Sequence, residues 1–441
     1  MLGRSVFLNI VGTVASLLIG FVASVVLARW LGPADRGLLA LMLSVGGIAM
    51  TLAAVGLPLA VVYFSSRNEA PGAIVGNSLA WGAALALLFV PAILLLHEQI
   101  ADLFARGRGG SLWVIVAALI PLTFLDWTAN NQILGRLRFG LFNALRVLSK
   151  MVYLLAILLL VVWLGAGVAG GLVATAAASL LMIAGSLPVI LRLERPRLDR
   201  RLLGDMLRYG RKVQVGSIFE ALNYRFDVVV LQFFRPLSQV GYYVVAQMIA
   251  ELVITFATAF QSSVQPLVAH YRGDERQQST TASALHHHGI LAAAAIVGNA
   301  ALGPLIIIFA FGPGFHSAVV PMLILLPGMW FLGTGTVVTG DLRGRGRPGL
   351  ASLLAGLVFV VTLILDLALI PPLGVPGAAV ASLIAYTAYG IASLVAVARV
   401  SGASVSDLVV PTKQDLRLYP QTVIRLLRRM RVSSLSTTLR A

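Results

Sequence analysis

Residues 350–370 read LASLLAGLVFVVTLILDLALI, a run of 21 residues in which Asp366 is the only charged side chain. The hydrocarbon core of a bilayer is about 30 Å thick, and an α-helix of about 20 apolar residues crosses it. Eleven further stretches of similar length and apolarity follow one another along the chain, so the sequence predicts an all-α polytopic membrane protein with about twelve transmembrane helices. The predicted spans are 6–28, 38–64, 75–96, 112–132, 142–163, 168–190, 213–234, 241–266, 284–310, 318–340, 350–370 and 377–398.

Composition and charge support the same fold class. Of the 441 residues, 59% are hydrophobic and 11% are charged, whereas soluble domains carry about 25% charged residues. The net charge of +16 would suit a nucleic-acid-binding protein, but 27 of the 33 Lys and Arg residues fall on one side of the predicted spans. This asymmetry is typical of the cytoplasmic side of a membrane protein. We therefore predict cytoplasmic N- and C-termini and no nucleic-acid partner.

A repeat divides the spans into two halves. Residues 135–140, GRLRFG, recur as residues 344–349, GRGRPG, at an offset of 209, and Arg36-Gly37 aligns with Val240-Gly241 at an offset of 204. Two six-helix lobes that begin on the same side of the membrane would produce this pattern. The predicted organisation is an N-terminal lobe at 1–190, a cytoplasmic basic linker at 191–212, a C-terminal lobe at 213–398 and a cytoplasmic basic tail at 399–441, which is either an interfacial helix or a disordered segment.

Cationic side chains inside the spans are candidates for binding an anion. Asn143, Arg146 and Lys150 share one face of the fifth span, and two cations so placed can hold a phosphate, although snorkelling at a cytoplasmic helix end would also explain them. Arg225 lies near the middle of the seventh span, where a charge costs about 2.5 to 3.5 kcal/mol. Arg225 therefore needs a structural salt bridge or a bound anionic substrate.

A polar stripe follows one face of the eighth span. A wet cavity that binds sugars would produce it, and so would hydrogen bonding between packed helices. Its members are Gln247, Glu251, Thr255, Thr258, Ser262 and Gln265. On the seventh span, Asn223 shares a face with Glu220 and Asp227, so Gln247 and Asn223 join the candidate substrate-binding residues.

Carboxylates within the spans are candidates for ion coupling. A carboxylate in an apolar setting can bind a proton or Na⁺ during a transport cycle, and the candidates are Asp126, Glu220, Asp227 and Glu251. No other cofactor is predicted, because the chain has no cysteine and no P-loop. The neighbouring His286, His287 and His288 point about 100° apart on a helix, so we interpret them as interfacial and predict no metal site. No catalytic residue is predicted, which favours a transporter over an enzyme.

Several segments resemble polysaccharide flippases. The segment LARWLGPADRG at residues 27–37, with Gly56-Leu57-Pro58 after it, is similar to the opening of that family. RFD at 225–227, VGYY at 240–243 and LGVPGAA at 373–379 look like landmarks of its second half. The motifs cover nearly the whole chain in order. On these residues the chain is identified as a member of the multidrug, oligosaccharidyl-lipid and polysaccharide exporter superfamily.

This resemblance implies two six-helix lobes around a central cleft and transport by alternating access. It implies a substrate that is an oligosaccharide linked to undecaprenyl diphosphate, moved from the cytoplasmic to the outer leaflet of the bacterial cytoplasmic (inner) membrane for surface polysaccharide biosynthesis. Membrane lipids and the polysaccharide polymerase or export machinery are the partners it implies. Asp227 and the Gly and Pro landmarks match the family pattern, whereas Arg225, Arg146 and Lys150 are candidates by location alone.

Other functions remain open at this point. A cation-coupled multidrug antiporter of the same superfamily would use the carboxylates but would have little need for Arg146 or Lys150. A membrane-embedded glycan polymerase or ligase usually needs a large outer loop, and the longest here runs from His97 to Ser111. A sugar transporter of the major facilitator fold would carry a Gly- and Arg-rich motif that residues 65–72 lack. Lipid II flippases have fourteen spans, which weakens a lipid II substrate.

Overall fold

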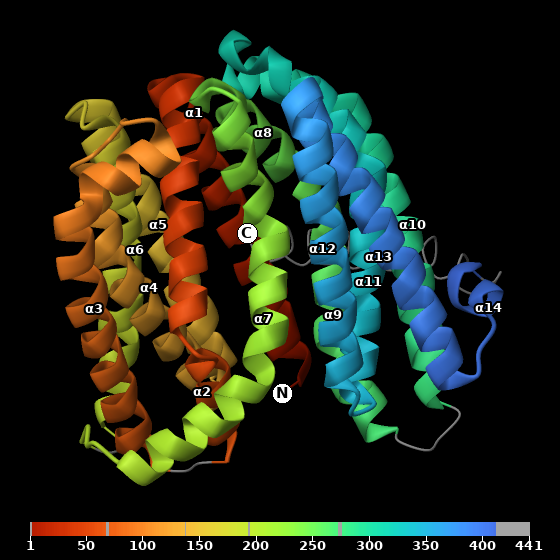
Figure 1. Ribbon diagram of the computed structural model, residues 1–441. Helices are drawn as coiled ribbons and strands as arrows, with labels where there is room; N and C mark the ends of the chain where they lie inside the picture. Colours follow the sequence, from red (N-terminus) through yellow and green to blue (C-terminus); the bar gives the residue numbers. More distant parts are fainter. Residues whose placement is uncertain (1, 68–69, 137, 193–194, 272–275, 412–441) are drawn as a thin grey trace, which may run out of the picture. The chain divides into compact units, whose positions relative to one another are not determined.

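A computed structural model describes residues 2–67, 70–136, 138–192, 195–271 and 276–411, apart from the side chains of residues 2–11, 13, 139 and 266. Within these ranges the regular elements are all helices (Figure 1), which confirms the predicted all-α fold. In the first half they are α1 (Leu2–Ala53), α2 (Leu57–Ser66), α3 (Pro71–Ala105), α4 (Leu112–Gly135), α5 (Phe139–Ile157) continued by η1 (Leu158–Trp163), and α6 (Gly167–Leu191). They continue as α7 (Arg200–Phe234), α8 (Leu237–Ala250), η2 (Glu251–Val253), α9 (Ile254–His270), α10 (Arg276–Leu305), η3 (Ile306–Phe311), η4 (Pro313–Ala318), α11 (Val319–Gly344), α12 (Pro348–Leu373), α13 (Val375–Ser401) and α14 (Val405–Val409).

The long helix α1 is a hairpin that turns at one residue. Gly32 has φ 70° and ψ 176°, a conformation that glycine adopts without steric cost, and Pro33 then starts a new helical segment. The guanidinium of Arg36 donates a hydrogen bond to the hydroxyl of Ser24 at 3.3 Å. In a straight helix these two residues would be about 18 Å apart along the axis. The element therefore supplies two membrane crossings.

The helices match the predicted spans in number. Among the residues that the structure describes, ten helical segments are long and apolar enough to cross a membrane, with α1 counted once and the more highly charged α7 left out. Counting both arms of α1 and adding α7 gives the predicted twelve. Large apolar side chains also face outward on these helices, including Leu87 and Leu95 along α3 and Trp163 at the end of η1, which is 82% exposed. Such surfaces are rare on soluble proteins and suit contact with lipid.

Two compact units divide the chain. Unit 1 comprises Met1–Ile249, Leu302–Leu325 and Ala355–Ser382, and unit 2 comprises Ala250–Ala301, Leu326–Leu354 and Leu383–Ala441. Unit 1 thus contains the first half, all of α7, most of α12 and, from the other helices of the second half, the ends that the charge pattern assigns to the outer side. Helix irregularities lie close to the divisions: η2 after Ile249, Pro304 in α10 and Pro327 in α11. The predicted lobes at 1–190 and 213–398 stay a prediction.

The basic linker is docked onto unit 1. Its residues from Arg200 onward form the first turns of α7, and the side chain of Asp199 caps them by accepting from the Leu202 N–H. Asn77 of α3 donates to the carbonyl of Asp199 at 3.0 Å and accepts from its N–H at 3.1 Å. Met206 is fully buried against α2 and α4. The apolar face of this segment therefore packs on protein. In the tail, residues 412–441, on which the predicted interfacial helix falls, lie outside the described residues.

The core of unit 2 includes two of the three histidines. His286 and His288 are buried, and Nε2 of His286 lies 2.9 Å from the carbonyl of Asp407 in α14. The interfacial interpretation of these two residues was wrong, because both are enclosed by protein: α14 covers His286, and Nε2 of His288 lies 3.2 Å from the carbonyl of Trp330 in α11.

Candidate functional site

A polar cluster lies inside the helix bundle of the first half. Asp126 of α4 accepts from Asn130 at 2.7 Å and from the hydroxyl of Ser179 of α6 at 2.9 Å. Lys150 of α5 is close enough to interact electrostatically with this carboxylate. The predicted coupling residue Asp126 and the predicted anion-binding residue Lys150 are therefore neighbours, and the negative charge of one is balanced by the other.

The three polar residues predicted on α5 have different environments. Asn143 is 5% exposed and packs against α1, where a Cβ placed on Gly12 would lie 3.0 Å from the Asn143 Cβ. The guanidinium of Arg146 lies over the Phe142 ring at 5.4 Å, and the ammonium of Lys150 lies 5.7 Å from the centre of the Tyr153 ring. Aromatic faces stabilise cations without neutralising them, so these two ring contacts are compatible with a bound anion.

Arg225 extends from α7 to the second arm of α1. Its Nη1 donates to the carbonyl of Leu43 at 3.3 Å. A Cβ on Gly47 would lie 3.2 Å from the guanidinium carbon, so glycine at this position gives the arginine its room. The Leu43 carbonyl brings no full negative charge, and the Arg225 side chain is exposed, so an anionic group can approach it.

The remaining polar candidates on α7 to α9 separate into buried and exposed residues. Asn223 is buried and donates to the carbonyl of Ala355 in α12 at 3.0 Å, while Gln247 is buried and Glu220 is exposed. Glu251 begins the 3-10 segment η2, so the predicted stripe is not carried by one regular helix. Farther along, Thr258 and Ser262 are exposed and donate to carbonyls of their own helix.

Asp227 is the centre of a buried network in unit 1. Its Oδ2 accepts from the hydroxyl of Tyr243 on α8, and its Oδ1 accepts from the Val228 N–H at 2.8 Å. The Tyr243 hydroxyl also lies 3.2 Å from the hydroxyl of Ser382 on α13. Asp227 and Tyr243 are at most 1% exposed. Three helices thus meet around one carboxylate.

Asp366 of α12 adds a second carboxylate to this network. It is fully buried, interacts electrostatically with Asp227, and neither of its carboxylate oxygens accepts a hydrogen bond from any part of the described chain. Two buried carboxylates repel each other unless a proton or metal cation is shared between them. This arrangement suits a small cation, with the hydroxyls of Tyr243 and Ser382 as further oxygen ligands.

The sequence-based site residues included Asp227 but omitted Asp366, Tyr243 and Ser382. Asp366 had a detectable signal, because it is the only charge within its span and an ionisable residue inside a span is a functional candidate by default. The contacts of Tyr243 and Ser382 had no such signal, because Ser382 is 139 residues from its partner.

Twelve apolar crossings with charged and hydroxylated side chains in their interior define a polytopic membrane protein of the transporter class. The model of the family described as "Polysaccharide biosynthesis protein" matches residues 2–271, and the chain belongs to this family. It is 25% identical over 374 residues to the "Probable low-salt glycan biosynthesis flippase Agl15" of Haloferax volcanii, with 81% of this chain and 75% of that protein covered.

Solved structures share the fold at low sequence identity. The lipid II flippase MurJ in an inward closed conformation superposes with a TM-score of 0.73 at 17% identity, covering 97% of this chain and 98% of that one. An inward-facing multidrug resistance MATE family transporter of the MOP superfamily has a TM-score of 0.72 at 16% identity, covering 89% and 98%. The chain therefore shares the fold of these transporters, and the match to the family model confirms the family predicted from the sequence.

Proposed function

We propose that this protein is a flippase for a lipid-linked oligosaccharide. In this proposal an undecaprenyl-diphosphate-linked glycan moves by alternating access from the cytoplasmic to the outer leaflet of the bacterial cytoplasmic membrane, with both termini cytoplasmic. Membership of the polysaccharide biosynthesis family and the similarity to a glycan biosynthesis flippase support transport of a glycan rather than catalysis on it.

The observation that carries this proposal is the set of cations within the spans. Arg225 donates to a backbone carbonyl, Arg146 and Lys150 lie over aromatic rings, and Lys150 also interacts electrostatically with Asp126. A diphosphate carries the charge that such side chains bind, and arginine adds paired hydrogen bonds to its oxygens. The energetic cost of three cations in a bilayer is then offset by the substrate.

The buried pair Asp227 and Asp366 is the proposed coupling site. A proton or Na⁺ bound between the carboxylates would neutralise them, and its release would leave two adjacent buried charges. Such a change in charge biases the packing of α7, α8, α12 and α13, which surround the pair. Coupling of this kind allows an ion gradient to drive glycan movement.

The first experiment measures glycan transport in cells that depend on this protein for surface polysaccharide. We expect Arg225→Gln and Arg146→Gln to reduce surface glycan by about tenfold or more, since each loses an interaction with the diphosphate. Arg201→Gln is the matched control, because Arg201 is an exposed arginine on the cytoplasmic linker. Normal output from both span variants, at unchanged protein levels, would refute the role of these cations.

A second candidate function is cation-coupled drug export, which the similarity to a multidrug resistance transporter favours. A drug antiporter would need Asp227 and Asp366 but not Arg146 or Lys150. Drug resistance that survives Arg146→Gln and disappears in Asp227→Asn would select it over the flippase. Loss of surface glycan without any change in drug resistance would select the flippase.

A further inference from the structure

Two glycines bring helices from the two halves into backbone contact. Gly37 lies on the second arm of α1, and a Cβ there would overlap the carbonyl oxygen of Leu237 and lie 2.8 Å from the Gly241 nitrogen on α8. A Cβ on Gly241 would in turn overlap the carbonyl oxygen of Pro33. Neither position has space for alanine, because the neighbouring atoms belong to backbone.

The two glycines make equivalent contacts when the two halves are aligned by the internal repeat. At the offset of 204, Pro33 corresponds to Leu237 and Gly37 corresponds to Gly241. Each helix therefore presents the same two positions, four residues apart, to its counterpart, as at the interface of a two-fold symmetric dimer. Small residues at this spacing allow close helix packing in membranes. The repeat axis of the two halves passes through this contact.

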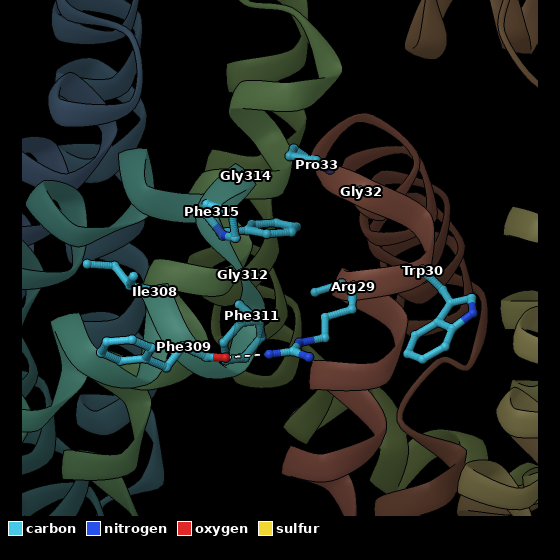
Figure 2. Close-up of a pocket in the computed structure, with 12 residues that line it drawn as sticks. Arg29, Trp30, Gly32, Pro33, Ile308, Phe309, Phe311, Gly312, Gly314 and Phe315 are labelled. Carbon is cyan, nitrogen blue, oxygen red and sulfur yellow. Dashed lines mark hydrogen bonds between the residues drawn. The ribbon is translucent and has the colours of Figure 1, made fainter.

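Two arginine contacts flank the glycines, and in each an arginine of the first half donates to the second half. Arg29 at the end of the first arm of α1 donates from Nη2 to the Phe309 carbonyl, near the end of η3 (Figure 2), and from Nε to the Ala310 carbonyl at 2.6 Å. Arg106 at the end of α3 donates to the Phe233 carbonyl at the end of α7 at 3.2 Å. These contacts join spans one and nine and spans three and seven, which are exchanged by the repeat.

The arginine contacts have the properties of a reversible closure. Carbonyls at a helix C-terminus lack partners within the helix and carry partial negative charge, so they suit a guanidinium. Arg29 is exposed and lines an open cavity of about 760 Å³, where water can replace the protein partner. Both arginines and both glycines lie at the helix ends that the charge pattern places outside.

We propose that the Gly37–Gly241 contact, flanked by Arg29 and Arg106, is the outer gate of the transport cycle, which the structure holds closed. This inference rests on the proposed alternating access. Besides α7 and most of α12, unit 1 includes the outer ends of α8, α10 and α11, and these helices leave unit 1 near η2, Pro304 and Pro327. Irregular helix segments of this kind are hinges in many proteins, so the outer ends can separate without unfolding their helices.

The first test locks the gate. The chain has no cysteine, so Trp30→Cys with Phe309→Cys, two exposed positions around the same cavity, can be joined by a flexible, reducible thiol cross-linker. We expect the cross-linked protein in vesicles to lose glycan translocation and to regain it when the linker is reduced. Translocation at the full rate with the linker intact would overturn the gate, because the contact would then be permanent.

The second test observes the gate without any substrate. Spin labels on the same two cysteines report the distribution of distances across the contact. We expect Gly37→Ala and Gly241→Ala to raise the ratio of separated to closed protein by about tenfold or more, because the new methyl groups overlap backbone. Gly20→Ala is the matched control on α1, since a Cβ there meets nothing within 4 Å.

Should the glycine variants fail to fold, the double variant Arg29→Gln with Arg106→Gln gives the same readout with the backbone contact intact. Distances identical to those of the unsubstituted protein in the folded variants would overturn the proposal. If the distances change as expected but the protein moves no glycan, the gate proposal stands and the proposed flippase function is refuted. The two failures are therefore distinguishable.

Discussion

The two turns that share the repeated Gly-Arg motif differ in how their arginine is satisfied. In unit 2, Arg345 donates from Nε to both carboxylate oxygens of Asp341 at 3.0 and 2.7 Å, and from Nη1 to Gln277 at 3.1 Å. Asp341 is fully buried and also accepts from the Thr281 hydroxyl at 2.5 Å. This turn, between α11 and α12, is therefore closed by an ion pair within a hydrogen-bonded network.

The equivalent turn in unit 1, between α4 and α5, lacks the carboxylate. Gln132 stands at the position of Asp341 and donates to the carbonyl of Pro71 at 3.2 Å. Nε and Nη2 of Arg136, the counterpart of Arg345, are buried and have no hydrogen-bond partner within the described chain. Burial, and secondly the charge of Arg138, lower the pKa of Arg136. The same motif thus forms a buried ion pair in the turn of unit 2, whereas in the turn of unit 1 the arginine lacks the equivalent carboxylate partner.

The largest effect is expected from removing the arginine of the closed turn. Arg345→Ala leaves the buried carboxylate of Asp341 without its cation, and breaking a buried pair in this way costs about 3–5 kcal/mol of folding free energy. Denaturant unfolding in detergent, followed by circular dichroism, measures the change. Arg347→Ala, an exposed arginine in the same turn, is the control. Equal unfolding midpoints for the two variants would show that the ion pair contributes nothing to stability.

A smaller effect of opposite sign is expected from giving the open turn its missing carboxylate. Gln132→Asp recreates the Asp–Arg pair of unit 2 and lets Arg136 donate to a charged acceptor, at the loss of the bond to Pro71. Hydrogen bonds to charged groups contribute about 1.5–3 kcal/mol, and the lost amide bond subtracts about 1 kcal/mol. We therefore expect a net gain of about 1 kcal/mol in the same unfolding assay. A loss of stability would mean that the two turns differ in backbone geometry and not only in charge.

The repeat itself was predictable from sequence, whereas the contacts that it produces were not. Twelve spans follow from hydropathy, because a bilayer imposes both the length and the apolarity of each helix. The segment Leu31-Gly32-Pro33 predicts the turn at Gly32, since glycine followed by proline commonly ends one helix and starts another. That Gly37 and Gly241 touch could not be read from their alignment, because an internal repeat does not reveal where its axis lies.

The candidate site was predicted only in part, for a related reason. Asp227 stood out as a charge within a span, but its partner Asp366 comes from a helix more than a hundred residues later in the chain. Periodicity locates residues on one face of one helix and contains no information about which helix packs there. The stripe on the eighth span was interrupted at Glu251, where the local sequence offers no glycine or proline to predict the 3-10 segment.

The smallest stability effect, and the most informative comparison of the two turns, is expected from Arg136→Met. Methionine keeps the apolar stem of the arginine and removes a guanidinium whose buried nitrogens have no partner, so folding stability should change by no more than about 0.5 kcal/mol. The matched Arg345→Met should be destabilising by several times as much, because Asp341 stays buried. If Arg136→Met keeps its stability but lowers glycan transport, the uncompensated cation serves substrate entry at the cytoplasmic face. If both stability and transport are unchanged, the difference between the two turns is a neutral divergence of the repeat.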